Sequence, residues 1–172
     1  MSHLNIEFKA ICQDPTRIRD FLKKHNAKLK GIDHQIDTYF NVSKGRLKLR
    51  EGKIENYLIY YERTDKEGPK ESKVTLFEVN LDSNLKEILV KSLGIKIIVN
   101  KKREIYFIEN VKIHIDDVEG LGNFIEVEAI DKDNTIGIEK LQEQCENFLN
   151  EFKITKNKLV SQSYSDLLLS KK

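Results

Sequence analysis

The chain has 172 residues, of which 30 are basic and 28 acidic, so its formal net charge is only +2. This near-neutral balance excludes a polybasic coat for nucleic acid, although charges can still be sorted by sign within the fold. No apolar run approaches the roughly 18 residues that a membrane span needs, and residues 1–10 lack the apolar core of a signal peptide. We therefore expect one soluble cytoplasmic domain over residues 1–172, with no nucleic-acid or membrane partner.

Alternation of apolar and polar residues with a period of two predicts about eight strands, of which segment 95–108 forms one long strand or two joined by a bend. In chain order the strands are expected at Leu4–Ile11, Ile32–Phe40, Gly45–Glu51, Tyr57–Arg63, Ser72–Val79, Ile95–Ile108, Val111–Asp117 and Asn123–Ile130. Asp14 and Pro15 begin a helix that runs to about Lys28, and Asp82 caps a second helix that ends near Gly94. Two further helices are expected at Asp133–Phe152 and Ser163–Ser170.

The polar faces of individual strands carry charges of one sign. Arg46, Lys48 and Arg50 share one face of a strand, and Glu126 and Glu128 share one face of another. Like charges two residues apart lie about 7 Å from each other and repel, so each face needs either solvent or opposite charges. A solvated outer face explains any single strand, but amphipathic helices need the apolar strand faces for packing. The pattern therefore favours an α+β fold, a closed eight-stranded antiparallel β-barrel with a charged lumen and helices outside.

A lumen lined by cations on some strands and by carboxylates on others suits one class of ligand. Lysine and arginine side chains would hold an extended polyphosphate, and the carboxylates would hold a divalent metal that bridges to it. Mg²⁺ prefers one or two carboxylates together with phosphate oxygens and water. His114, by contrast, is expected to be structural, because no second histidine lies near it in the sequence.

Several segments resemble the CYTH superfamily, the triphosphate tunnel metalloenzymes, which takes in class IV adenylate cyclases and thiamine triphosphatases. Glu7-Phe8-Lys9 resembles the end of the ExExK motif on the first strand of that superfamily, with Asn5 in place of the first glutamate. The other matching segments occur in the expected order at Asp37–Phe40, Gly45–Arg50, Lys101–Tyr106, Ile113–Glu128 and Ser163–Leu168. The last of these is similar to the C-terminal tail of the cyclase-like members. The resemblance implies an eight-stranded antiparallel tunnel that binds triphosphates with a divalent metal, Mg²⁺ or Mn²⁺.

The resemblance also implies roles for individual residues. Glu7, Glu126 and Glu128 would be metal ligands. The candidate phosphate ligands are Lys9, Arg46, Lys48, Arg50, Arg63, Lys70, Lys101 and Arg103. Lys101 and Arg103 would also act in catalysis, together with Asp116, which falls where the cyclase-like members carry an aspartate near the nucleophile. Asn5 brings no charge, so one metal position would be weakened or lost.

Three functions remain open at this point. The cyclase hypothesis, which the tail and the Lys101-to-Asp116 arrangement favour, converts ATP to cyclic AMP and pyrophosphate. The triphosphatase hypothesis uses the same clamp to hydrolyse thiamine triphosphate, a nucleoside triphosphate or inorganic tripolyphosphate. A non-catalytic polyphosphate-binding module is the third, and a structural β-barrel with solvated charges is the alternative that involves no ligand. A homodimer would match the cyclase-like members, although no segment of the sequence marks an interface.

Overall fold

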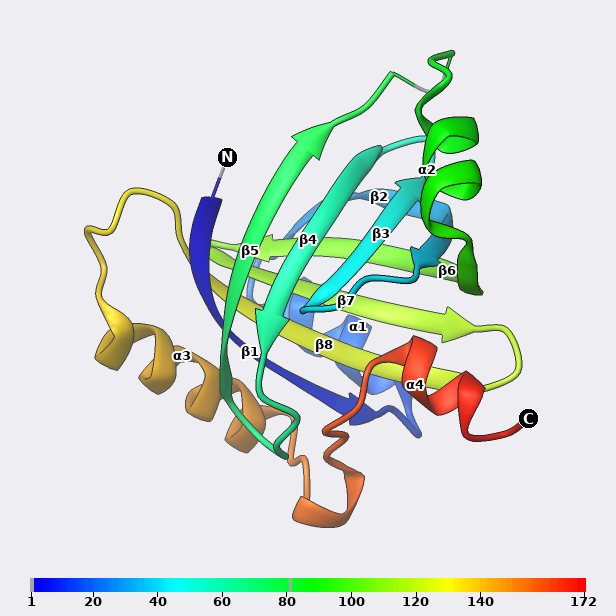
Figure 1. The fold of residues 1–172 in the computed structure, drawn as a ribbon. Coiled ribbons are helices and arrows are strands. Elements are labelled where there is room, and N and C mark those ends of the chain that lie inside the picture. Colours follow the sequence, from blue (N-terminus) through cyan, green and yellow to red (C-terminus); the bar gives the residue numbers. More distant parts are fainter. Residues whose placement is uncertain (1, 81) are drawn as a thin grey trace.

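Eight strands close into an antiparallel barrel in the computed structural model, which describes residues 2–80 and 82–172 (Figure 1). The strands are β1 (Ser2–Ile11), β2 (Lys28–Phe40), β3 (Arg46–Glu51), β4 (Tyr57–Arg63), β5 (Lys70–Glu78), β6 (Ile95–Ile108), β7 (Val111–Val118) and β8 (Gly122–Asp131). Around the barrel their order is β1-β5-β4-β3-β2-β6-β7-β8, and β8 pairs with β1 to complete the ring. This confirms the predicted fold class.

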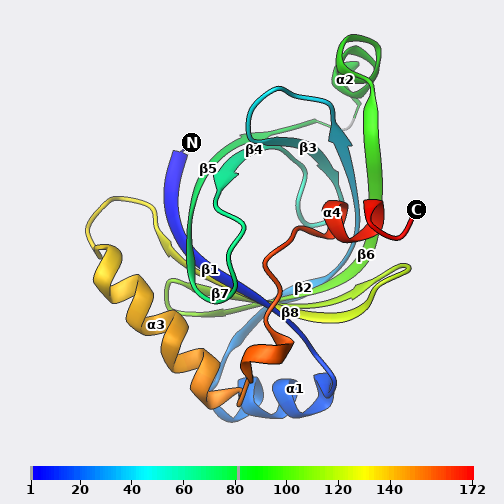
Figure 2. The same cartoon turned by 60° about the horizontal axis from the view of Figure 1, so that its bottom comes forward.

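Four α-helices and one 3-10 helix lie outside the barrel. They are α1 (Pro15–Lys24), α2 (Leu85–Leu93), α3 (Ile138–Glu151), η1 (Lys156–Lys158) and α4 (Tyr164–Leu169). In Figure 2, α1 and α3 lie on one side of the barrel, α2 stands on the other side, and α4 lies near the ends of β6 and β8. Among the described residues, no helix is long and apolar enough to cross a membrane.

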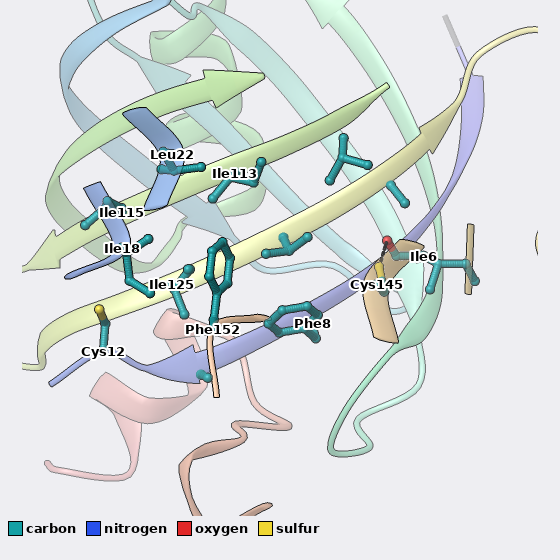
Figure 3. Close-up of a cluster of buried hydrophobic side chains, with 14 of the residues drawn as sticks. Ile6, Phe8, Cys12, Ile18, Leu22, Ile113, Ile115, Ile125, Cys145 and Phe152 are labelled. Carbon is teal, nitrogen blue, oxygen red and sulfur yellow. Dashed lines mark hydrogen bonds between the residues drawn. The ribbon is translucent and has the colours of Figure 1, made fainter. Parts of the chain in front are cut away.

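Strand alternation sorts the side chains between the lumen and the outer core. On β1, Ile6 and Phe8 point outward and are almost fully buried by helices, whereas Glu7 and Lys9 line the lumen. The main core between the barrel and the helices includes Leu22 of α1 and Cys145 of α3 (Figure 3). Each large apolar side chain buried there contributes about 1.5–3 kcal/mol. The helices therefore pack against the apolar strand faces, and the charged strand faces line the lumen.

Two smaller clusters fix the other helices. On the α2 side, Phe40 and Leu49 pack against that helix. At one end of the barrel, Tyr164 of α4 packs edge-on against Phe124 of β8, with ring centroids 5.1 Å apart. We call this end the α4 end and the opposite one the Tyr57 end, because Tyr57 begins β4 there. The C-terminal segment thus packs against the barrel at this end.

The helices are shorter than the sequence predicted, for local reasons. The first ends at Lys24 because Asn26 has a positive φ of 54° and Lys28 already pairs with Phe107 in the sheet. The second begins at Leu85 after Asn84, so Asp82 is not its cap. The third begins at Ile138, because the backbone N–H groups of residues 135–137 donate to the Asp131 carboxylate instead of continuing a helix.

Candidate functional site

The inward strand faces surround a cavity of about 230 Å³, and half of the residues that line it are charged. Among the described residues, its cations are Lys9, Lys30, Lys48, Arg50, Arg63, Lys101, Arg103, Lys112 and Lys132. Its carboxylates are Glu7, Glu55, Glu126 and Glu128. Two more carboxylates, Asp37 and Asp116, are fully buried in contact with these cations. The cations remain in excess, which favours an anionic ligand.

Asp37 on β2 is the centre of one ion cluster. Its carboxylate accepts from Lys48 at 2.9 Å, from Lys101 at 2.7 Å, and from both Nε and Nη2 of Arg50 at 2.9 Å. Burial alone would raise the pKa of Asp37, but these three cations hold it well below its usual range. Burial in turn lowers the pKa of Lys101 well below its ordinary value, although Asp37 opposes the shift. Arg50 also binds Glu55, but among the described residues Lys48 and Lys101 have Asp37 as their one acidic partner, which leaves positive charge that an added anion can neutralise.

Arg103 on β6 joins a second cluster. Its Nε and Nη2 donate to Asp116 at 2.7 and 2.5 Å, and Nη2 also donates to Glu126 at 2.6 Å. Glu126 lies 3.1 Å from the Lys9 ammonium as well. Burial alone would raise the pKa of Glu126, but Lys9 and Arg103 hold it well below its usual range. Glu126 is therefore ionised and shared between two cations.

The acidic side of the lumen is formed by β1 and β8, where Glu7 and Glu128 are paired in register. Arg63 of β4 donates to Glu7 at 2.6 Å, and its Nε and Nη2 are buried without a hydrogen-bond partner among the described residues. Burial raises the pKa of Glu128 to about 7; Lys112 opposes this shift, whereas Glu7 adds to it. The site thus contains unused cationic donors on one strand and a carboxylate that lacks enough positive charge on another.

His114, Glu126 and Glu128 place one potential ligand atom each within 4.8 Å of one another. Both ring nitrogens of His114 are buried and have no hydrogen-bond partner within the described part of the chain, and neither does the Oδ1 atom of Asn5. Burial, aided by Arg103 and Lys112, lowers the pKa of His114 to about 3, so the ring is neutral and keeps a free lone pair. These donors fit a divalent cation. His114, which we expected to be structural, becomes a further candidate ligand.

The structure brings together most of the residues predicted from the sequence, but not all of them. Lys9, Lys48, Arg50, Arg63, Lys101 and Arg103 line the cavity, as do Glu7, Glu126 and Glu128. Arg46 instead binds Asp65 and Asp166 at 2.8 Å each, at the α4 end. Lys70 donates to the carbonyl oxygens of Lys66 and Ser161. Asp116 is fully buried behind Arg103 and is absent from the cavity lining.

The charged or polar groups of the site that the prediction missed include Asp37, Lys112, Tyr164 and Glu55, together with Lys30 and Lys132 of the cavity lining. Asp37 and Lys112 lie on the inward face of their strands, and the alternation pattern could have identified them. Tyr164 lies in the tail segment that the resemblance had marked without a role. Glu55 lies in the β3–β4 loop, where its backbone N–H donates to Asp33, and it binds Arg50 at 3.2 Å and Lys112 at 2.6 Å. No sequence signal distinguishes this loop glutamate.

Comparison with known protein families agrees with this barrel geometry. The CYTH domain family model matches residues 3–164. The chain belongs to the CYTH family. A protein of Methanocaldococcus jannaschii named as a candidate adenylate cyclase is 30% identical over 178 aligned residues, which cover 95% of this chain and 98% of that protein.

Solved structures share the CYTH fold. A Pyrococcus horikoshii OT3 protein matches with a TM-score of 0.79 and 24% identity, over 95% of this chain and 98% of its own. A candidate adenylyl cyclase from Hippeastrum, described as revealing a dominant triphosphatase activity, matches with a TM-score of 0.63 and 15% identity, over 99% and 96%. At such identities the likeness shows the fold alone. CYTH is the triphosphate tunnel family, and membership of this family implies that a protein binds a divalent metal.

Proposed function

We propose that this CYTH protein binds an organic triphosphate with a divalent cation in its lumen and, like a class IV adenylate cyclase, converts ATP to cyclic AMP and pyrophosphate. The observation that carries this proposal is the order of residue types along the lumen. From the α4 end, β1 presents Lys9, Glu7 and Asn5 in turn, and β8 presents Glu126, Glu128 and then Ile130. Lys9 and Glu126 therefore face each other nearest the α4 end, Glu7 and Glu128 follow, and the uncharged side chains of Asn5 and Ile130 come last.

The Tyr57 end of the cavity supports a substrate with an organic group. Tyr57, Phe107 and Ile130 line this end and are only half-buried. A fully charged inorganic tripolyphosphate would gain nothing from these apolar surfaces, whereas a nucleoside or another organic group would bury area against them. Lys30 and Lys132 at the same end would attract the polyanion as it approaches.

This order also bears on the site of reaction. With the organic group at the Tyr57 end, the terminal phosphates would lie among Lys9, Arg63 and Arg103, and the phosphate next to the organic group would lie beside the carboxylates. A bound divalent cation would polarise that phosphate and lower the pKa of the attacking hydroxyl. Lysine and arginine side chains would hold the leaving pyrophosphate and neutralise its growing charge. In this step the ribose 3′ oxygen bonds to the α-phosphorus as the bond to pyrophosphate breaks, and the proton of the 3′ hydroxyl is released to water.

Triphosphate hydrolysis is the second candidate function. It uses the same cations, with water attacking the terminal phosphorus at the α4 end. Its support is that Asp116, the residue expected near the cyclase nucleophile, is fully buried behind Arg103 and is absent from the cavity lining. The activity described for the Hippeastrum protein points the same way. A non-catalytic binding module is a third outcome, because Asn5 brings no charge where the family motif has a glutamate.

Product analysis tests the proposal. The protein is incubated with ATP, GTP, thiamine triphosphate or tripolyphosphate and with Mg²⁺ or Mn²⁺, and the products are resolved by chromatography. We expect cyclic AMP and pyrophosphate from ATP, and loss of both in Lys101→Met. Lys91→Met, which removes an exposed lysine on α2, serves as the control. Inorganic phosphate without a cyclic product would refute the cyclase, and binding without turnover would identify a binding module.

A further inference from the structure

The C-terminal segment reaches the phosphate-binding side of the lumen through one hydrogen-bonded chain. The Tyr164 hydroxyl, at the first position of α4, donates to Oδ2 of Asp116 at 2.7 Å. Asp116 in turn accepts from Nε and Nη2 of Arg103 at 2.7 and 2.5 Å. All three side chains are at least nine-tenths buried. No other aspartate among the described residues connects the tail to a cation of the cavity lining in this way.

Burial strengthens this series of hydrogen bonds and fixes which group donates. Burial raises the pKa of Tyr164 well above its ordinary value, and Asp116 adds to the shift, so the hydroxyl keeps its proton and acts as a donor. A buried carboxylate that loses one of its donors pays a desolvation penalty, so its orientation depends on all of them. The Tyr164 ring also makes an edge contact with Phe124, and the Lys9 ammonium lies 3.9 Å from its centroid.

The hydrogen bonds from Tyr164 through Asp116 fix how Arg103 faces the lumen. Asp116 grips the Nε–Nη2 edge of the guanidinium, and Glu126 takes a second bond from Nη2. Within residues 2–80 and 82–172, no group is hydrogen-bonded to Nη1 of Arg103. Since Arg103 lines the cavity, this nitrogen is the donor left for a ligand oxygen. An arginine whose guanidinium is already held by a carboxylate can donate its remaining N–H groups to a ligand with little further loss of side-chain entropy.

We propose that Tyr164 is a positioning residue, which orients Arg103 toward the ligand phosphates through Asp116. Asp116 is then a positioning residue too and not the group that meets the nucleophile. The C-terminal segment becomes part of the phosphate site, although none of its own cations lines the cavity. This inference rests on the proposed function only in that phosphates bind in the lumen.

The chain contains a matched control on the outer face of the same strand. Tyr106 donates to Glu104 at 2.8 Å, and Glu104 accepts from Nε of Arg19 at 3.0 Å. Tyrosine, carboxylate and arginine are thus joined as they are inside the barrel, but on the outer face of the strand, and none of the three lines the cavity. Tyr106→Phe therefore removes the same kind of hydrogen bond without touching the proposed site, and it reports what a purely structural loss does.

Calorimetric titration with tripolyphosphate, in the full chain and without turnover, measures the effect on binding. We expect Tyr164→Phe to weaken binding about twofold to thirtyfold, the range typical of residues that act on a site through other residues, and Tyr106→Phe to bind like the wild type. Asp116→Asn should also weaken binding. Unchanged or tighter binding in Tyr164→Phe, or equal weakening in Tyr106→Phe, would overturn the proposal. So would an Asp116→Asn variant that loses turnover but binds normally.

A second measurement needs no ligand and separates this inference from the proposed function. In protein labelled with ¹⁵N-arginine, the Arg103 Nε–H resonance should shift or broaden in Tyr164→Phe and stay in place in Tyr106→Phe. An unmoved resonance would contradict the positioning role. If the wild type binds no triphosphate while the resonance does move, the proposed function fails and the link from Tyr164 to Arg103 stands.

Discussion

Replacing Asp37 by Asn tests whether the lumen depends on its central carboxylate. Asp37 is 1% exposed and accepts from three cations, so Asp37→Asn leaves Lys48, Arg50 and Lys101 without their shared counter-charge. Removing one partner of a buried ion pair costs about 3–5 kcal/mol. For a domain of this size, each kcal/mol lowers the melting temperature by about 2–4 °C. We therefore expect a drop of about 6–20 °C at pH 7.

The pH dependence of this drop has a definite sign. Because the pKa of Asp37 in the folded state lies well below its unfolded value, its contribution to stability is complete above about pH 4. It is lost as the pH falls through the folded pKa, so the gap between wild type and variant should narrow on acidification. Tripolyphosphate should restore part of the lost stability at pH 7, since an anion replaces the missing charge.

Thermal melts followed by circular dichroism, at several pH values and with or without tripolyphosphate, measure these effects. Asp20→Asn on the exposed face of α1 is the control and should melt like the wild type. The reasoning fails if Asp37→Asn melts with the wild type at pH 7. It also fails if the gap does not narrow on acidification.

Two further predictions concern the metal and phosphate ligands. Because burial raises the pKa of Glu128 to about 7, Mn²⁺ affinity should increase as the pH rises through 7 and Glu128 ionises, and Glu128→Gln should remove most of this dependence in titrations at pH 6 and 8. Arg63→Ala should weaken tripolyphosphate binding at least about tenfold, whereas Arg46→Ala, whose guanidinium binds Asp65 and Asp166 outside the cavity lining, should change it little. Equal losses in the two arginine variants would contradict the assignment of Arg46.

The sequence predicted the barrel better than the contacts inside it. A period of two assigns every residue of a strand to one face, so Lys9, Arg103 and Glu126 could be placed in the lumen without a structure. Register is a long-range property, however, and only the paired strands reveal that Arg103 faces Asp116. Asp37 finds its cations 11, 13 and 64 residues away, and no local pattern encodes such a set. The predicted start of the third helix was wrong because the Asp131 carboxylate accepts hydrogen bonds from the backbone N–H groups of residues 135–137.

The ion pairs in the lumen also determine which ligands can enter. Lys9 and Arg103 are both bound to Glu126, so a simple anion must compete with that carboxylate and gains little. Under the proposed function, Glu126 would bind the divalent cation that accompanies a triphosphate, and Lys9 and Arg103 would exchange Glu126 for the phosphates. The two ligands should therefore raise each other's affinity by the same factor.

Glu126→Gln isolates this coupling. The variant removes the charge that both the cation and the two basic side chains share, and it keeps the size of the side chain. Titrations of tripolyphosphate with and without Mn²⁺ give the coupling factor for each protein, and the formation of metal–phosphate complexes in solution is the same for both. We expect a coupling of about 5- to 150-fold in the wild type and a much smaller one in the variant. A coupling that survives in Glu126→Gln would mean that metal and phosphate do not compete for the lumen's internal ion pairs at this residue.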